Sequence, residues 1–475
     1  MASIAGIVSQ HGKIDDDSAQ IVGKMLKDMR HRGPDNSSIR SIPDYRGAVG
    51  ANEINLSPER TICSCLEDAP YILFDGKIFN DRSDQSQRDI DLFIDLYQKY
   101  ERECFSQIDG SFVCAVVEKD DEVFFFSSEM KGLKDHVQFD IHELPPGHIY
   151  SSYDGLKKFQ TFKPDVPEPG DNVQEAAKIL RELLIDAVRR RMDDANAISL
   201  SGGLDSSIIA AIAKGFNPNI KLFTGTVQRA QGPDLENAKL MADFLGLEHF
   251  VYEITDDDIE QIIPKAIWYL ESFDEDCVSG ILSNYYVSRK VKEYSSAVLV
   301  GEGADELFGG YRMVLKNPKV KSPEQRERLA KKLLDIAYNT ALRRMDRSWM
   351  ANSVVYKTPF LDTRVVAFAE KIPMKWKIYG EKQVEKFVLR EAFRDMLPEK
   401  IANREKLRFA MGTGMDDVMD EIVAAKINPE EIKSRPKAAY GLRFATFKEL
   451  YYYDEFLKLF PPSYEKQTIR WDPFK

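Results

Sequence analysis

Short apolar and aromatic runs dominate the first 160 residues or so of the chain. Turns rich in Asp, Lys and Gly separate these runs, a pattern typical of β-strands. Helical periodicity interrupts it only near 18–29 and 90–100. We therefore expect a β-rich N-terminal domain with two helices. The expected strands include Ile4–Val8, Tyr71–Phe74, Phe112–Val117 and Val123–Phe126.

The pattern changes after Lys163–Gly170, a Pro- and Gly-rich stretch that indicates a linker. Beyond it, short buried strands alternate with amphipathic helices, which predicts a doubly wound parallel sheet with ligands at the carboxyl ends of its strands. After about residue 320 the pattern is mostly helical. We expect domains at 1–162 and 172–475, joined by a linker at 163–171. Strands are expected at 197–200, 221–227, 249–254 and 297–300, and helices at 175–192, 236–245, 259–271 and 283–293.

Composition narrows the classes of protein to consider. The net charge of −11 argues against a nucleic-acid partner, which would require a basic face. Since no run of about 18 apolar residues occurs, nothing is expected to span a membrane. The N-terminus lacks the basic and apolar regions of a signal peptide. Five scattered cysteines do not form a disulfide framework, so we expect a cytoplasmic protein.

The segment Leu200–Ser207 carries the clearest chemical signal. Ser201-Gly202-Gly203-Leu204-Asp205-Ser206-Ser207 follows an apolar strand and opens into a helix. Two glycines let successive backbone N–H groups converge, and the helix N-terminus and the serine hydroxyls add donors, so the loop is suited to phosphate. It lacks the Gly-Lys-Ser/Thr of a Walker loop and resembles the pyrophosphate loop of N-type ATP pyrophosphatases.

A second signal, Gly301–Tyr311, follows the last strand of the predicted sheet. Glu302, Asp305 and Glu306 repel one another unless a cation or ligand shares the site. Mg²⁺ typically takes one or two carboxylates together with phosphate oxygens. We therefore expect Asp205 and Asp305 to bind Mg²⁺ together.

Several further motifs occur in a fixed order along nearly the whole chain. Together with the two segments above, they resemble the glutamine-hydrolysing asparagine synthetase family. The family implies a class II glutaminase-like domain of the Ntn-hydrolase type, followed by a PP-loop synthetase domain. It is also compatible with a homodimer. The motifs are His31–Asp35, Phe74–Asn80, Leu144–His148, Met345–Arg347, Thr358–Asp362, Val384–Glu391 and Leu450–Tyr453.

The resemblance implies a chemistry for the C-terminal half: an acyl-adenylate forms from ATP and a carboxylate, pyrophosphate leaves, and a nitrogen nucleophile displaces AMP. Donors, Mg²⁺ and a lysine near the leaving phosphates would lower the barrier. Lys386 matches the family's catalytic lysine, and Glu302 would lie near the reacting acyl group. The implied ATP and pyrophosphate contacts are Leu200, Ser201, Gly202, Gly203, Asp205, Ser206, Gly225 and Gly301.

The glutaminase-like half departs from the family at its reacting residues. Ala2 stands where that chemistry needs a cysteine whose own α-amine serves as base. Glu53 replaces an arginine for the glutamine carboxylate, and Asp75-Gly76-Lys77 replaces Asn-Gly-Glu. Asp89 alone keeps its family type. We therefore expect a degenerate glutaminase site and a nitrogen source other than glutamine.

The pocket expected to bind the carboxylate substrate also departs from the family's pattern. Asp276–Ser279 stands in place of the family's Thr-Thr-x-Arg, which removes an expected cation, and Val355 and Lys357 replace a glutamate and an arginine. We place Asp276 and Ser279 in a remodelled substrate pocket. The Tyr–carboxylate pair of the related β-lactam and carbapenam synthetases is also missing, since Glu302 and Val355 occupy those positions.

The leading interpretation is an AMP-forming amide ligase that acts on a small carboxylate with ammonia or an amine. A second interpretation, that the protein is asparagine synthetase itself and uses aspartate, stays open. A silent nucleotide-binding partner is a third reading, although it would not need Asp205, Asp305 and Lys386. A PP-loop tRNA-modifying enzyme is a fourth, which the acidic composition disfavours.

Overall fold

The computed structural model divides the chain into two compact units, Met1–Lys163 (unit 1) and Pro164–Lys475 (unit 2). It describes residues 2–8, 18–42, 47–54, 63–65, 71–80, 87–117, 124–137, 141–230, 232–311, 317, 320, 322–406 and 412–468. Among the helices in these ranges, none has the length and apolar character needed to cross a bilayer.

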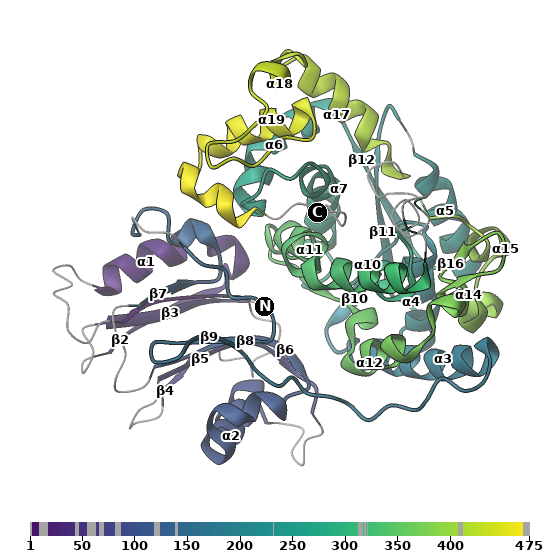
Figure 1. The fold of residues 1–475 in the computed structure, drawn as a ribbon, viewed down its shortest axis with the longest axis horizontal. Coiled ribbons are helices and arrows are strands. Elements are labelled where there is room, and N and C mark those ends of the chain that lie inside the picture. The colour runs from purple at the N-terminus through teal and green to yellow at the C-terminus, as the bar shows by residue number, and fades with distance from the viewer. Residues whose placement is uncertain are drawn as a thin grey trace. The chain divides into compact units, whose positions relative to one another are not determined.

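Unit 1 consists of two packed antiparallel sheets with a helix on each outer face (Figure 1). The strands are β1 (Ser3–Val8), β2 (Asn36–Ile42), β3 (Gly47–Glu53), β4 (Cys63–Cys65), β5 (Tyr71–Ile78), β6 (Gly110–Val117), β7 (Phe124–Ser127), β8 (His148–Ser151) and β9 (Gly155–Lys158), and the helices are α1 (Ser18–Asp28) and α2 (Asp89–Tyr100), with 3₁₀ turns η1 (Arg30–Arg32), η3 (Glu101–Ser106) and η4 (Met130–Gly132). One sheet has the order β2-β3-β1-β7 and the other β4-β5-β6, while β8 and β9 form a separate hairpin.

This layering explains the continuous apolar run that begins the chain. On β1, Ile4 and Val8 face the second sheet, whereas Ala5 and Ile7 pack against α1. Because both faces of the strand are covered, every residue of β1 is buried. The four expected strands and two expected helices of this half are confirmed, with Val123 outside the described residues, whereas β2, β3, β4, β8 and β9 were missed.

Unit 2 contains a five-stranded parallel sheet. Its strands are β10 (Ala195–Ser199), β11 (Lys221–Val227), β12 (His249–Ile254), β13 (Ala297–Leu299) and β14 (Val355–Lys357), and a small separate ladder is made of β15 (Ile378–Tyr379) and β16 (Val384–Glu385). The strand order in the sheet is β12-β11-β10-β13-β14. Helices α4 (Leu204–Phe216) and α5 (Pro233–Leu245) pack on one face, and α7 (Glu275–Lys292) and α11 (Ala341–Met350) cover the other.

Helices make up the rest of unit 2. They are α3 (Val173–Arg189), α6 (Asp256–Leu270), α8 (Ala304–Phe308), α10 (Pro323–Ile336), α12 (Thr363–Lys371), α13 (Met374–Lys377), α14 (Phe387–Phe393), α15 (Glu399–Ala402), α17 (Met415–Ala424), α18 (Glu431–Ser434) and α19 (Phe447–Leu457), with 3₁₀ turns η5 (Ala337–Asn339), η6 (Pro359–Leu361), η7 (Arg394–Met396) and η8 (Pro462–Gln467). Helices α18 and α19 lie near the end of the described chain (yellow in Figure 1).

The strand order confirms the predicted doubly wound sheet and locates its switch point. The chain runs outward through β10, β11 and β12, then crosses back to β13 on the other side of β10. Loops that leave β10 and β13 therefore diverge at one place, where open parallel sheets bind ligands. The four expected strands are present, while the three-residue β14 was missed within the stretch expected to be helical.

The expected linker is partly fastened to unit 2. Lys371 of α12 donates to the carbonyl oxygen of Val166 at 2.9 Å and pairs with Glu168 at 2.7 Å. Val166 is itself buried. The segment after Lys163 thus packs along α12 before α3 begins.

Candidate active site

The loop between β10 and α4 has the geometry of an anion cradle. Gly202 has a φ of +69°, and a Cβ there would lie 2.5 Å from the carbonyl oxygen of Asp234. Only glycine fits this close approach to α5. Ser206 Oγ accepts from the backbone N–H of Ser201 at 3.1 Å, and the two hydroxyl oxygens lie 3.0 Å apart. These contacts hold the loop against the first turn of α4, whose free N–H groups favour an anion.

The loop after β13 meets this cradle at the switch point. A Cβ on Gly301 would lie 2.8 Å from the backbone nitrogen of Ser206, so the two loops touch. On the neighbouring strand, Thr224 Oγ1 donates to the carbonyl oxygen of Leu200 at 2.5 Å. Gly225 follows Thr224 and packs against Val287 of α7. The structure thus brings the residues expected around ATP to one edge of the sheet.

Lys386 links the two aspartates that were expected to share Mg²⁺. Its Nζ lies 2.6 Å from Oδ2 of Asp205 and 2.6 Å from Oδ1 of Asp305, and only 1% of the residue is exposed. It adopts a φ of +55° at the start of α14. A non-glycine residue held in this region is costly, and such strain is found at functional sites.

A second lysine, which the sequence analysis missed, completes this group. Nζ of Lys406 lies 2.8 Å from Oδ2 of Asp305. Burial opposes ionisation of Asp305, but the two ammonium groups prevail and hold the pKa of its carboxyl well below the usual range. Burial likewise opposes the charge on Lys406, while Asp305 and Asp205 raise its pKa. Asp305 and Lys406 are therefore both ionised at neutral pH.

The two aspartates fit a divalent cation. Oδ1 of Asp205 is buried without a hydrogen-bond partner among the described residues. Oδ1 of Asp305 lies near Lys386 Nζ without hydrogen-bond geometry. The unpartnered oxygen of Asp205 suits Mg²⁺, which takes its other ligands from phosphates and water, whereas Asp305 would have to exchange its contact with Lys386 for the ion. The ranges that the structure covers hold no cluster of three or more His, Cys, Asp or Glu that would suggest a metal bound by protein alone.

The third carboxylate of the acidic segment has a different partner from the other two. Glu306 is buried and accepts a hydrogen bond from the hydroxyl of Tyr311. Burial, followed by the charges of Glu302 and Asp305, raises the pKa of Glu306 to about 7. The repulsion anticipated from the sequence is therefore relieved partly by a proton on Glu306.

Glu302 lies at the other end of the site, in contact with a cation. Nη2 of Arg344, on α11, is 3.2 Å from Oε1 of Glu302, and Nη1 is 3.1 Å from Oδ2 of Asp276. A Cβ on Gly280 would lie 2.3 Å from Cδ of Arg344, so the arginine lies directly over α7. A cation therefore does lie beside Asp276, although it comes from α11 and not from the segment where the sequence analysis looked for it. The other predicted pocket residue, Ser279, is buried one turn beyond Asp276.

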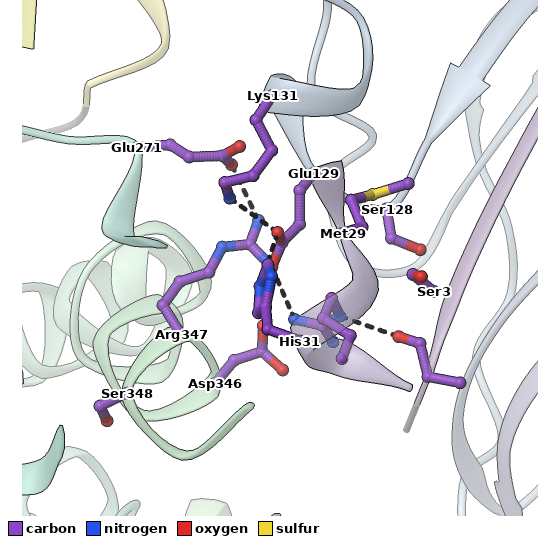
Figure 2. Close-up of polar contacts among 12 residues, drawn as sticks. Ser3, Met29, His31, Ser128, Glu129, Lys131, Glu271, Asp346, Arg347 and Ser348 are labelled. Carbon is purple, nitrogen blue, oxygen red and sulfur yellow. Dashed lines mark hydrogen bonds and ion pairs between the residues drawn. The ribbon is translucent and has the colours of Figure 1, made fainter. Parts of the chain in front are cut away.

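Two arginines of unit 2 hold the parts around the site in place. Arg404 donates to the carbonyl oxygen of Gly202 at 2.7 Å and pairs with Asp234, which fastens the cradle. Arg347 pairs with Glu271 at 3.2 Å and with Asp346 at 2.9 Å, which ties α11 to the end of α6 (Figure 2). Arg404 and Lys406 lie in one short segment. The sequence signal that could have identified them is a pair of basic side chains shortly before a Gly-rich stretch.

In unit 1, the structure brings Ala2, Glu53 and Asp75 together. The backbone nitrogen of Ala2 lies 2.9 Å from each carboxylate oxygen of Asp75. Glu53 follows Asn52, which pairs with Ser3 in the sheet, and its carboxylate accepts from Asn36 at 3.1 Å. One carboxylate thus contacts the backbone nitrogen of Ala2, and a second lies on the strand next to β1.

The other predicted residues of this site lie along β5. A Cβ on Gly76 would lie 2.4 Å from Cβ of Phe112, so β6 passes too closely for a side chain there. Lys77 follows on the same strand, and Asp89 accepts from the backbone N–H of Ile78 at 2.8 Å, where it caps the strand end.

Two cations and a histidine, whose pKa is lowered by burial, surround a buried carboxylate nearby. Glu129 contacts His31 at 3.1 Å and Lys131 at 2.7 Å (Figure 2). It also pairs with Arg32 at 3.0 Å. Arg32 also donates to the carbonyl oxygen of Ala2 at 2.8 Å. This network fixes the start of β1 from the side opposite Asp75.

Comparisons with known proteins give a consistent picture. A family model described as asparagine synthase matches residues 179–335 and 318–468. Asparagine synthetase B (glutamine-hydrolyzing) of Escherichia coli strain K12 is 29% identical, over 97% of this chain and 92% of its own length. The maize (Zea mays) asparagine synthetase (glutamine-hydrolyzing) is 28% identical, over 95% of this chain and 85% of its own.

Two solved structures also align with the chain. One is the NMN synthetase of Francisella tularensis, with 13% identity and a TM-score of 0.30, covering 64% of this chain and 100% of that chain. The other is the NH3-dependent NAD synthetase of Campylobacter jejuni, with 18% identity and a TM-score of 0.24, covering 43% of this chain and 98% of that chain.

Proposed function

The chain belongs to the asparagine synthase family, and from this premise we propose that it is an AMP-forming amide ligase whose nitrogen source is ammonia or an amine. Membership makes it a carbon–nitrogen ligase that uses ATP. The proposal adds that the reaction proceeds through an acyl-adenylate with release of pyrophosphate, and that the glutaminase site is inactive.

One observation carries the proposal: Lys386 lies between Asp205 and Asp305, beside the cradle of Ser201–Gly203. A module that only binds nucleotide needs the cradle, but it has no use for a buried lysine held in strained backbone among acidic groups. Cleavage of the α–β phosphate bond does have such a use, because negative charge builds up on the departing pyrophosphate.

In the proposed first step, the cradle's N–H groups hold the phosphates of ATP. A carboxylate oxygen of the acid attacks the α-phosphorus, and the bond to the oxygen that bridges to the β-phosphate breaks. Lys386 and Lys406 stabilise the charge that this oxygen gains. Mg²⁺, held by Asp205 and Asp305, would supply further positive charge to the phosphates.

In the second step, a neutral amine nitrogen attacks the acyl carbon, and AMP leaves with the electron pair of the broken C–O bond. The nitrogen must lose a proton as the amide forms. We assign this role to Glu302, which directly follows Gly301, the residue whose backbone lies against Ser206. Burial raises the pKa of Glu302, although Arg344 and Lys406 oppose that rise. A carboxylate with a raised pKa is a better proton acceptor.

Unit 1 supports the proposed nitrogen source. Ala2 offers no nucleophile, and the carboxylate of Asp75 lies where it would hold an α-amine as ammonium, which is a poor base. Glu53 would repel the carboxylate of glutamine. We infer that unit 1 is a degenerate class II glutaminase-like domain of the Ntn-hydrolase type that acts as a scaffold.

The test is a pyrophosphate-release assay with Mg²⁺, ATP, ammonium chloride and a panel of small carboxylic acids. We expect release with at least one acid, and ATP–pyrophosphate exchange with that acid before any nitrogen donor is added. Absence of exchange with every acid in a broad panel would contradict adenylation.

The names of the relatives favour a second candidate, in which the acid is aspartate and the product asparagine. Aspartate in the same panel, with asparagine measured by chromatography, decides between the two. A cytoplasmic location and a homodimer stay predictions.

A further inference from the structure

A buried ion pair that the proposed mechanism does not use lies next to Lys386. Nη2 of Arg390, on α14, is 3.1 Å from Oε1 of Glu385, the last residue of β16. Each side chain is 3% exposed, and Glu385 directly precedes Lys386 in the chain. Because lost hydration offsets the attraction between buried charges, such a pair adds little net stability. A contribution to stability therefore does not explain why this pair lies beside the lysine.

The side chain of Arg390 holds the peptide group that precedes Lys386. Its Nε donates to the carbonyl oxygen of Glu385 at 2.9 Å. The N–H of the same peptide group, which belongs to Lys386, donates to the carbonyl oxygen of Phe308 at 3.3 Å. The following peptide group is held too, since the carbonyl oxygen of Lys386 accepts from the backbone N–H of Arg390 at 2.9 Å. The angles φ and ψ of a residue orient its two flanking peptide groups, so these contacts maintain the φ of +55° at Lys386.

The same ion pair holds the segment that carries Lys406. Oε1 of Glu385 accepts from the backbone N–H of Lys406 at 3.1 Å. Nη1 of Arg390 donates to the carbonyl oxygen of Ala402 at 2.7 Å, and Nη2 donates to that of Arg404 at 2.8 Å. A guanidinium presents five N–H donors in a rigid fork, so one side chain can hold several carbonyl groups in a fixed arrangement. Glu385 and Arg390 thus connect the backbones of both lysines.

The two ammonium groups need a rigid support because they carry like charges. Nζ of Lys386 lies 2.6 Å from Oδ1 of Asp305, and Nζ of Lys406 lies 2.8 Å from Oδ2 of the same residue. The two cations repel each other across this carboxylate, and each is attached to a flexible four-carbon stem. A displacement of about 1 Å in an active site can cost on the order of 10²-fold in rate. The position of the two backbones therefore determines how well the charges meet a departing anion.

We propose that Glu385 and Arg390 are positioning residues, which hold Lys386 and Lys406 in the arrangement that binds the leaving pyrophosphate. In this role each acts through the backbone of the lysines, and neither needs to touch the substrate. The inference rests on the proposed function, because it explains how the two lysines of that mechanism are kept in place.

Binding of pyrophosphate to the full-length protein with Mg²⁺, measured by isothermal titration calorimetry, tests the proposal without any turnover. Arg390→Lys keeps a positive charge beside Glu385, but an ammonium group lacks the rigid fork that holds several carbonyl groups. We expect this variant to bind pyrophosphate about tenfold more weakly than the wild type, because the two lysine charges are displaced.

A double-mutant cycle separates positioning from a general structural role. In a protein that already carries Lys386→Ala, Arg390→Lys should weaken pyrophosphate binding only about threefold, because one of the two positioned charges is absent. A residue that merely supported the fold would cause the same loss in both backgrounds.

Arg394→Lys is the matched control. Nη1 of Arg394 donates to Oδ1 of Asn403 at 3.0 Å, in the same segment that Arg390 holds, but its side chain is 49% exposed. This variant should bind pyrophosphate as the wild type does.

Glu385→Asp provides a second test if Arg390→Lys does not fold. It keeps the negative charge beside Arg390 but shortens the side chain by one methylene, so the hydrogen bond from the N–H of Lys406 should be lost. We expect a similar loss of pyrophosphate affinity, and a smaller one in a protein that already carries Lys406→Ala.

Equal losses in both backgrounds of the cycle would overturn the inference, as would wild-type affinity in Arg390→Lys or a wild type that does not bind pyrophosphate. A protein that shows the expected cycle but exchanges pyrophosphate with no acid contradicts only the proposed function. A protein that exchanges pyrophosphate with an acid, while Arg390→Lys binds it as the wild type does, contradicts only the positioning role.

Discussion

Nζ of Lys386 lies 2.6 Å from Oδ2 of Asp205, although 181 residues separate them in the chain. Asp205 lies in the first turn of α4 beside the phosphate cradle, and Lys386 immediately precedes α14. The contact thus joins the most distinctive motif of the sequence to a segment that shows no unusual feature when read alone.

Replacement of Lys386 by alanine should lower pyrophosphate release on the order of 10²- to 10³-fold, because one preorganised positive charge at the leaving phosphates is removed. Steady-state assays with saturating ATP would measure this loss. Lys382→Ala, at an exposed position four residues earlier, is the matched control and should retain full activity. Equal turnover in the two variants would favour the nucleotide-binding partner over the enzyme.

Gly310→Ala should disrupt the same cluster through sterics alone. A Cβ at Gly310 would lie 1.8 Å from Oδ1 of Asp305 and 2.4 Å from Cε of Lys386. We expect a loss of stability of about 1–3 kcal/mol and a marked loss of activity. The unfolding temperature and pyrophosphate release measure the two effects.

The control for this variant is Gly215→Ala, also a glycine-to-alanine change. Gly215 lies within α4, and a Cβ there would contact nothing within 4 Å. Alanine should stabilise this helix by about 0.5–1 kcal/mol and leave activity intact. The steric argument fails if both variants show the same sign of change in stability.

Glu306 should make the stability of unit 2 depend on pH. Because the fold raises the pKa of Glu306 from its ordinary value of 4.5 to about 7, the folded state binds its proton more tightly than the unfolded state. Stability from this group is therefore present below pH 4.5 and lost as the pH rises through about 7. Glu306→Gln, which keeps an acceptor for Tyr311, should escape this loss.

Unfolding temperatures at about pH 5 and about pH 8, on either side of the folded-state pKa of Glu306, provide the measurement. The variant should gain stability relative to the wild type between these values, whereas Glu381→Gln, at an exposed position, should follow the wild type throughout. A constant difference between Glu306→Gln and the wild type would mean that Glu306 does not titrate in this range.

Restoring a cysteine should not restore glutaminase activity. In Ala2→Cys, Asp75 would still lie 2.9 Å from the backbone nitrogen of residue 2, and Glu53, which we propose repels the carboxylate of glutamine, would be unchanged. We expect glutamate release from glutamine to stay at background in the wild type and the variant. Ammonium chloride in the same assay mixture should support pyrophosphate release, which serves as the positive control. Measurable glutaminase activity in Ala2→Cys would refute our view of unit 1.

The local architecture and the position of the phosphate cradle could be predicted from the residues alone. Short apolar runs place the strands at Ile4–Val8 and Lys221–Val227, because strands covered on both faces keep apolar residues on both. The Gly202-Gly203 turn was also readable, since its backbone geometry depends on the glycines themselves. The three-residue strand β14 could not be predicted from the sequence, because so short a run shows no hydrophobic periodicity.

The pairing of the charges became visible only in the folded chain. Glu302, Asp305 and Glu306 look equivalent in the sequence, yet each has a different partner in the fold. Glu302 meets Arg344, Asp305 meets two lysines, and Glu306 takes its hydrogen bond from Tyr311. These partners come from segments that lie far apart in the chain or on the opposite side of a short helix. Coulomb energy depends on the distance between charges in space, and the local pattern of residues does not encode that distance.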